Sequence, residues 1–216
     1  FIHFRYDLPL LIVFTTFFKK RKIICEAHVL VTGWSRKLVK KCFAVIIILN
    51  AAKQAYLADE AEFDVGKYIV APDGVSLEDF EIKKTKEQLR TELGLPLDKK
   101  IILYTGYFYK WKGVDVLIEA AKYLNPDELM VLVGGSDVDI ARMQALHADA
   151  NQGKIQFIGH KPYSQMPQYQ MAADCLVVTT AKSDEGRGTF TSPLKLFEYM
   201  ASGNPIVASD SVSIRE

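Results

Sequence analysis

A short loop rich in glycine and lysine, residues 105–113, holds groups that could bind a phosphate. It follows an apolar run and precedes an amphipathic one, so we expect it to join a strand to a helix. The backbone N–H groups of such a loop point toward the carboxyl edge of a parallel sheet, where anions bind. Lys112, at the entrance of the helix, would neutralise a phosphate as a point charge. The alternative is an ordinary turn with exposed lysines.

The glycine spacing of this loop argues against two common nucleotide-binding classes. It matches neither G-x-G-x-x-G nor G-x-x-x-x-G-K-[ST], so the sequence gives little support to a dehydrogenase or an NTPase. A second turn, after the next apolar run, carries Gly134 and Gly135, where a ligand could approach the backbone closely. Many α/β proteins need glycine there only for the turn. His160 follows the third apolar run and is interpreted as a surface loop residue.

The strongest pattern is residues 192–208, in which a capped helix leads into a strand. Ser192 is a favourable N-cap, and the proline after it suits the first helical position. Lys195 in the first turn opposes the helix dipole at a cost of about 0.3–1 kcal/mol, and an anion docked there would reverse the sign. One turn further in, the Glu198 carboxylate could accept hydrogen bonds from two ribose hydroxyls. The alternative is an i, i+3 surface pair of Lys195 and Glu198.

Composition narrows the class of protein. The chain has 216 residues, of which 49% are hydrophobic and 25% are charged, so a packed core is expected and disorder is not. The net charge of +1 argues against a strongly basic nucleic-acid binder. Three scattered cysteines, Cys25, Cys42 and Cys175, predict reduced thiols in a cytosolic environment and no zinc site.

Charge is uneven along the chain. Residues 1–50 carry nine Lys and Arg against two carboxylates, whereas the remainder is net negative. The basic clusters at residues 19–22 and 36–41 are expected to face an anionic acceptor or an anionic membrane surface; a solvated charged face is the alternative. The apolar run at residues 8–18 is too short for a bilayer span, which needs roughly 20 residues. We interpret it as a buried helix capped by Asp7.

Apolar runs rich in β-branched residues alternate with helix-like segments. Most runs are continuously apolar, as expected for parallel strands covered on both faces. Strands are expected at residues 23–25, 44–49, 68–71, 101–105, 129–133, 155–158, 175–179 and 206–208, and helices at 85–93, 114–124, 137–151, 163–172 and 193–201. The alternation predicts an α/β protein built on doubly wound parallel sheets.

A turn signal at residues 72–74 and the charged stretch 83–100 predict a domain boundary. Residues 1–72 would be the C-terminal part of one domain, residues 73–82 a linker, and residues 83–216 most of a second domain. The chain opens inside an apolar run and closes on a helix start, so we expect it to be a piece of a longer protein.

Taken together, these motifs resemble the retaining glycosyltransferases of family 4, the group 1 enzymes with the GT-B fold. The donor-side motifs at residues 105–113, 133–135 and 192–208 occur in the family's order and at its spacing, and residues 3–7, 26–28 and 69–75 resemble the end of its acceptor-binding domain. The resemblance implies two Rossmann-like domains. The first is partial, and the second, which binds a nucleotide sugar, lacks its C-terminal helices.

The resemblance also assigns roles to individual residues. It implies that Lys112 binds the donor diphosphate, that Glu198 binds the ribose, and that His28 is the acceptor-domain histidine that faces the sugar. These three form the expected catalytic set. The expected donor-binding set is Gly106, Tyr107, Lys112, Gly134, Gly135, Leu194, Lys195 and Glu198.

Two positions depart from the family's pattern. The family usually has arginine directly after the first glycine of its phosphate loop, where this chain has Tyr107. The family's second glutamate, eight positions before Glu198, is replaced by Phe190. We expect the Phe190 ring to pack against the cleft wall or to cap the loop 182–188. Asp184 or Glu185 of that loop could reach the donor sugar instead.

The expected activity is transfer of a sugar from a nucleoside diphosphate sugar to a hydroxyl of a glycan or lipid-linked acceptor, with retention. Polysaccharide, lipopolysaccharide or glycolipid synthesis is the expected setting. Lys112, Lys195 and helix N-terminal amides could stabilise the departing diphosphate, so we expect a metal-independent reaction without a cofactor. The protein is expected to be cytoplasmic, with peripheral contact at the inner membrane face, and the isolated piece to be inactive. The alternatives are a nucleotide-sugar-binding domain without turnover and a nucleotide-sugar epimerase of similar fold.

Overall fold

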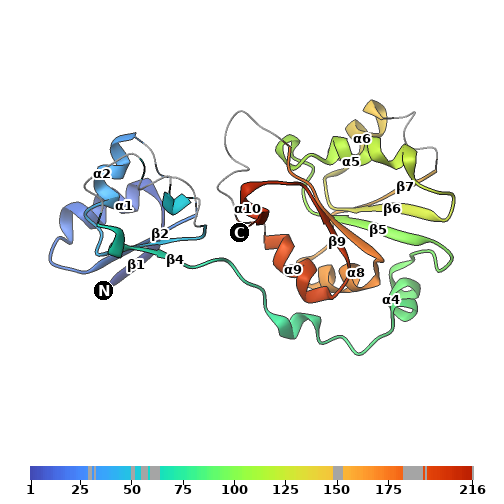
Figure 1. The fold of residues 1–216 in the computed structure, drawn as a ribbon, viewed down its shortest axis with the longest axis horizontal. Helices are drawn as coiled ribbons and strands as arrows, with labels where there is room; N and C mark the ends of the chain where they lie inside the picture. The colour runs from blue at the N-terminus through green and yellow to red at the C-terminus, as the bar shows by residue number, and fades with distance from the viewer. Residues whose placement is uncertain are drawn as a thin grey trace. The chain divides into compact units, whose positions relative to one another are not determined.

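The computed structural model describes residues 1–28, 31, 33–49, 52–54, 58, 64–147, 153–181, 192 and 194–215. These residues form two compact units (Figure 1). The first unit contains Phe1–Asp73, and the final helix α10 (Val212–Arg215) is grouped with it. The second unit begins at Gly74 and ends at Asp210. The predictions for Phe190 and for the loop 182–188 fall outside the described residues.

The first unit is built on a parallel sheet in the order β1-β2-β3-β4. Its strands are β1 (Ile2–Arg5), β2 (Ile23–Ala27), β3 (Ala44–Ile47) and β4 (Tyr68–Val70), and its described helices are α1 (Leu8–Phe17), η1 (Gly33–Ser35), α2 (Arg36–Val39) and η2 (Val65–Lys67). Cys25, Val45 and Ile47 are fully buried at its centre, as expected for continuously apolar strands.

Helix α1 begins where the sequence predicts. The Asp7 carboxylate accepts a hydrogen bond from the backbone N–H of Leu10, 3.1 Å away, and a proline stands in the first turn. The expectation of a buried helix is only partly correct, because Leu11 is buried whereas Ile12 and Phe17 are exposed. Within the part of the chain that the structure describes, no helix has the length and apolar character needed to cross a bilayer.

The second unit is built on a five-stranded parallel sheet in the order β7-β6-β5-β8-β9. The strands are β5 (Lys100–Thr105), β6 (Glu128–Val133), β7 (Ile155–Gly159), β8 (Cys175–Val178) and β9 (Ile206–Ala208). The chain moves outward from β5 to β7 and then returns to place β8 on the other side of β5. The strand order therefore reverses between β5 and β8, which is where open α/β sheets form a ligand crevice.

Helices cover both faces of this second sheet (Figure 1). Helices α5 (Val114–Ala120) and α6 (Asp137–Leu146) lie on one face, and α8 (Met166–Ala172) and α9 (Leu194–Ser202) on the other, with α4 (Lys86–Leu93) packed on α8. Two expected helices start or end with a 3-10 turn, at η5 (Ala121–Tyr123) and η6 (Tyr163–Gln165). The arrangement confirms the predicted doubly wound α/β fold.

The segment expected to be a linker, residues 73–82, is largely part of the second unit. Its 3-10 helix η3 (Leu77–Phe80) packs against α8 and α9. Further along, the Asp174 carboxylate ties α4 to the sheet: it accepts hydrogen bonds from the Ile101 N–H at 2.7 Å, from Lys86 Nζ at 3.1 Å and from Arg90 Nη2 at 2.5 Å. The Arg90 side chain is buried and also donates to the backbone oxygen of Ala172 at 2.9 Å.

Candidate functional site

A pocket of about 220 Å³ opens at the carboxyl ends of β5, β6 and β7. Its wall consists of the loop glycines, aromatic rings and a few longer side chains: Gly106, Tyr107, Val133, Gly134, Gly135, His160, Lys161, Tyr163 and Met166. Four of the expected donor-binding residues are therefore together in one pocket. His160, interpreted from sequence as a surface loop residue, also lines it.

The glycines of this pocket are required by close contact between two loops. A Cβ atom on Gly134 would lie 2.1 Å from the backbone oxygen of Gly106, and one on Gly135 would lie 2.6 Å from the Phe108 ring. Both glycines also have positive φ angles. The N–H groups of Gly106 and Gly134 donate to the backbone oxygens of Val133 and Gly159. These two N–H groups hold the loops together and are therefore not free to bind a ligand.

Lys112 stands where the strand order reverses. It belongs to the 3-10 helix η4 (Lys110–Lys112), and Gly113 after it adopts a left-handed conformation. A Cβ on Gly113 would lie 3.1 Å from the backbone nitrogen of Ala181, which itself donates to the Trp111 oxygen. These contacts join the loop after β5 to the end of β8 and position Lys112 there. Burial lowers the pKa of the Lys112 amine, whose Nζ lies 3.9 Å from the centre of the Trp111 ring.

A stack of aromatic rings that the motifs did not predict supports this loop. The Tyr107 and Tyr109 rings stack with centroids 5.3 Å apart, and the Tyr109 and Trp111 rings stack at 6.3 Å. His160 approaches the Tyr107 ring at 6.4 Å. Aromatic residues at every second position of the loop were the available signal. The stack runs from the pocket to Lys112 and orders the loop between them.

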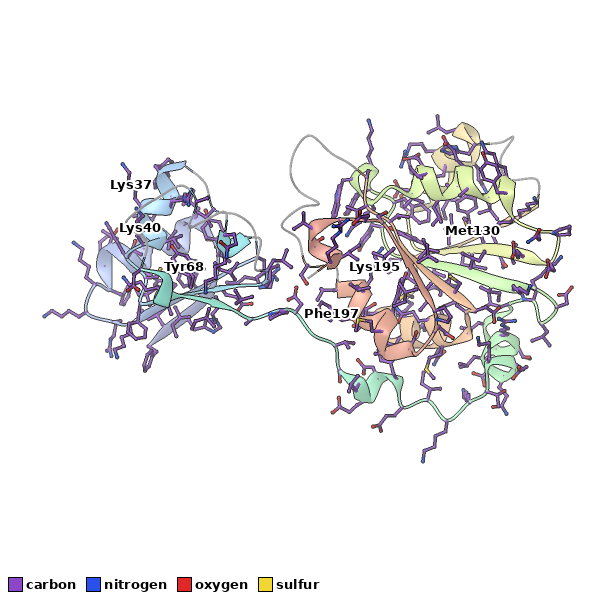
Figure 2. All side chains as sticks on the ribbon, viewed as in Figure 1. Lys37, Lys40, Tyr68, Met130, Lys195 and Phe197 are labelled. Carbon is purple, nitrogen blue, oxygen red and sulfur yellow. The ribbon has the colours of Figure 1, made fainter. Side chains whose placement is uncertain are left out.

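Lys195 lies beside the same loop, on α9 (Figure 2). Its Nζ atom is inaccessible to solvent, has no hydrogen-bond partner among the described residues, and lies 3.9 Å from the centre of the Tyr104 ring. It lies so close to Gly106 that a Cβ atom there would approach Nζ to 3.0 Å. Burial lowers the pKa of Lys195 to about 7, with a further contribution from the charge of Lys112 and an opposing one from Glu198.

Glu198 is held by neighbours from α8 and η6. Its carboxylate accepts a hydrogen bond from Gln170 Nε2 at 3.0 Å, and Gln170 is fully buried. Tyr163 of η6 also lies near Glu198; burial, followed by the nearby carboxylate, raises the pKa of that tyrosine. No sequence signal pointed to Gln170 or Tyr163, because both lie about 30 residues away. Leu194, the first residue of α9, is exposed.

Tyr199 ties α9 to the end of β5. Its hydroxyl accepts a hydrogen bond from the Thr105 N–H at 2.9 Å and lies 3.1 Å from the Thr105 hydroxyl. The side chain is fully buried, and burial raises the pKa of Tyr199 to about 12. Because Lys195 lies one turn before Tyr199 on the same helix, this anchor places Lys195 beside the β5 loop.

His28 belongs to the first unit, directly after β2. Its Nε2 lies 2.5 Å from the Glu26 carboxylate, and its Nδ1 lies 4.0 Å from that of Asp73. Glu26 also pairs with His3 at 3.2 Å, and the hydrogen bond from His28 lowers the pKa of Glu26. Throughout the described parts of both units, no group of three or more His, Cys, Asp or Glu is arranged to hold a metal ion.

The family of this chain follows from its sequence match. Residues 85–216, which cover most of the second unit, match the family model described as glycosyl transferases group 1, and the chain belongs to this family. This confirms the family predicted from the motifs at the ends of β5 and β6 and at α9.

Curated relatives agree with this membership. The D-inositol 3-phosphate glycosyltransferase of Xylanimonas cellulosilytica is 29% identical over 155 residues, covering 68% of this chain and 36% of that protein. The putative teichuronic acid biosynthesis glycosyltransferase TuaC of Bacillus subtilis is 30% identical over 142 residues, covering 65% of this chain and 33% of TuaC. The chain therefore spans about a third of the length of these relatives.

Solved structures share the fold. HepE of Anabaena, determined in complex with UDP and glucose, has a TM-score of 0.79 at 17% identity. The match covers 100% of this chain and 61% of the HepE chain. The sucrose-phosphate synthase of Thermosynechococcus elongatus has a TM-score of 0.77 at 23% identity, over 99% of this chain and 57% of that protein. The fold is GT-B, as the motifs predict.

Proposed function

We propose that the second unit binds a nucleoside diphosphate sugar, and that the whole protein transfers its sugar to a hydroxyl acceptor with retention. The observation that carries the proposal is the grouping of Lys112, Lys195 and Glu198 where the strand order reverses. The lysines would bind the diphosphate and Glu198 the ribose, on opposite sides of one ligand. HepE, of similar fold, was determined with UDP and glucose.

The chemistry of the departing group supports this assignment. Breaking the bond between sugar and diphosphate leaves negative charge on the phosphate oxygens, which positioned cations stabilise. Two lysines beside the β5 loop would supply that charge, so we propose a reaction that needs no metal ion and no other cofactor. His28, hydrogen-bonded to Glu26, is assigned to the sugar by resemblance to the family.

The setting of the reaction is proposed from the relatives. Their names include teichuronic acid biosynthesis, colanic acid biosynthesis and a galactosyltransferase acting on a diphosphoundecaprenol-linked sugar. We place this protein in polysaccharide, lipopolysaccharide or glycolipid synthesis in the cytoplasm, with a glycan or lipid-linked acceptor.

Thermal unfolding with UDP, GDP and ADP tests the donor assignment. The matching nucleoside diphosphate at 100 times its dissociation constant should add about 2.7 kcal/mol of stability, which raises Tm by about 5–10 °C. Glu198→Gln should reduce this shift, because the ribose hydroxyls would lose a charged acceptor. Glu119→Gln, on the exposed side of α5, is the matched control and should keep it.

Two results would redirect the proposal. If none of the three nucleotides raises Tm, the second unit does not bind a nucleoside diphosphate. If the full-length protein binds the nucleotide sugar but releases no nucleoside diphosphate with or without acceptor, it is a binding protein without turnover. Recovery of an epimerised sugar still attached to its nucleotide would identify an epimerase.

A contact with an anionic membrane is proposed for the first unit. Residues 19–22 are four consecutive exposed basic residues that follow α1, whose Ile12 and Phe17 are exposed. Each basic residue near an anionic surface contributes about 1 kcal/mol. Replacing Lys19 and Lys20 by glutamine should therefore weaken co-sedimentation with phosphatidylserine vesicles by about 30-fold.

The control replaces Lys83 and Lys84 of the second unit by glutamine, which leaves net charge equal to that of the Lys19 and Lys20 variant. This control should bind the vesicles like the parent. Equal losses from both double variants would mean that only overall charge matters, and binding independent of anionic lipid would exclude the contact.

A further inference from the structure

Lys195 is a buried amine that points at the β5 loop without a hydrogen-bond acceptor. Its Nζ is inaccessible to solvent and unpartnered among the residues the structure describes. The Tyr104 ring lies 3.9 Å from Nζ, and a Cβ atom on Gly106, the glycine that precedes Tyr107, would lie 3.0 Å from it. Burying an amine without a carboxylate partner costs free energy, and buried lysines normally have such a partner. A lysine at this position of α9 is therefore unusual.

The charged groups around Lys195 do not stabilise an ammonium ion well. From β5 it meets the neutral Tyr104 ring, from η4 the positive charge of Lys112, and from α9 the carboxylate of Glu198. The Glu198 carboxylate already accepts a hydrogen bond from Gln170. A ring face compensates only part of the cost of burying a charge, and a neighbouring lysine adds to that cost.

We propose that Lys195, on α9, is a second cation for the diphosphate, in place of the arginine that the family usually has at the position of Tyr107. The amine of Lys195 is uncharged while the site is empty, and it takes up one proton from solvent when a diphosphate binds. The inference rests on the proposed function, because it deepens the role of the same site. A neutral amine avoids repulsion from Lys112 in the empty site. The diphosphate then brings negative charge and hydrogen-bond acceptors for both lysines.

Proton uptake makes binding depend on pH in a definite direction. The pKa of Lys195 in the empty site is about 7, so the amine is mostly neutral above that pH. Binding must then recruit a proton, which costs a factor of ten in affinity for each pH unit above the pKa of the empty site. Affinity for a nucleoside diphosphate should therefore fall about tenfold from about pH 7.5 to about pH 8.5.

Calorimetry with UDP, GDP and ADP tests the proton directly. Near pH 8, titrations in two buffers of different ionisation enthalpy should show close to one proton taken up per nucleotide bound. Lys195→Met should bind about 10- to 100-fold more weakly below pH 7, without proton uptake and without the alkaline loss of affinity. Lys110→Met removes an exposed lysine of the same loop and should keep both properties.

Binding by the parent without proton uptake would overturn the inference while leaving the proposed function intact. Equal uptake by the parent and Lys195→Met would also overturn it. If no nucleotide binds, the proposed function fails instead, and NMR of isotope-labelled lysine still decides the charge of the empty site. An amine that titrates near neutral pH and is missing from Lys195→Met supports the inference, whereas titration of every lysine in the ordinary range refutes it.

Discussion

Replacing Lys112 by alanine should weaken the binding of the matching nucleoside diphosphate by about 10- to 100-fold. Hydrogen bonds to charged groups contribute about 1.5–3 kcal/mol each, and Lys112 is the side chain that η4 places at the reversal of strand order. The loss should be the same for the nucleotide sugar and for the free nucleoside diphosphate, because the contact is with the phosphates. Calorimetry with both ligands measures it.

The controls separate lost contact from lost structure. Lys110→Ala removes an exposed lysine two residues away and should bind like the parent. Because burial lowers the pKa of Lys112, its charge is a cost in the empty site, so Lys112→Ala should unfold at a temperature no lower than the parent. If Lys112→Ala bound the nucleoside diphosphate as tightly as the parent, the phosphate site would have to lie elsewhere.

Replacing Asp174 by alanine should lower the free energy of unfolding of the second unit by about 3–5 kcal/mol. Arg90 is only 6% exposed, and the change leaves its guanidinium without the Asp174 carboxylate as a partner. It also leaves the Ile101 N–H without a hydrogen-bond acceptor. Asp127→Ala is the matched control. The Asp127 carboxylate pairs with exposed Lys100 at 3.2 Å, and its removal should lower the free energy of unfolding by at most about 1 kcal/mol.

Urea unfolding followed by Trp111 fluorescence measures this difference, with Trp34 of the first unit replaced by phenylalanine in every variant. A loss as small as that of Asp127→Ala would show that Asp174 does not hold α4 to the sheet. The pH dependence gives a second check. Burial raises the pKa of Asp174, but hydrogen bonds from Ile101, Lys86 and Arg90 outweigh it and hold the pKa below the ordinary 3.8.

A carboxyl whose pKa is lowered by folding contributes its full stability above the ordinary pKa and loses it as the pH falls through the folded-state value. The difference in free energy of unfolding between the parent and Asp174→Ala should therefore be constant near neutral pH and become smaller in strong acid. A gap that stays unchanged into acid would mean that the effect comes from packing and not from the ionised carboxylate.

Local patterns in the sequence determined which segments became helices and strands. Continuous apolar runs predicted buried parallel strands, and the residue types at positions 7–10 sufficed to predict the cap formed by Asp7, because its hydrogen bond spans only three residues. The same holds for the strand-to-helix loops with Gly134 and Lys112. The family resemblance was equally local, since it depended on motifs whose residues are neighbours in the chain.

Tertiary structure alone decided which of these residues meet. Tyr199 and Thr105 are 94 residues apart, and Gln170 and Glu198 are 28 apart, so both contacts depend on the order β7-β6-β5-β8-β9 and not on any local spacing. The engaged N–H groups of Gly106 and Gly134 follow from the same order. Lys195 shows the consequence most clearly: its place in the helix is evident from sequence, whereas its lowered pKa arises from burial beside Lys112, which only the packed sheet and helices create.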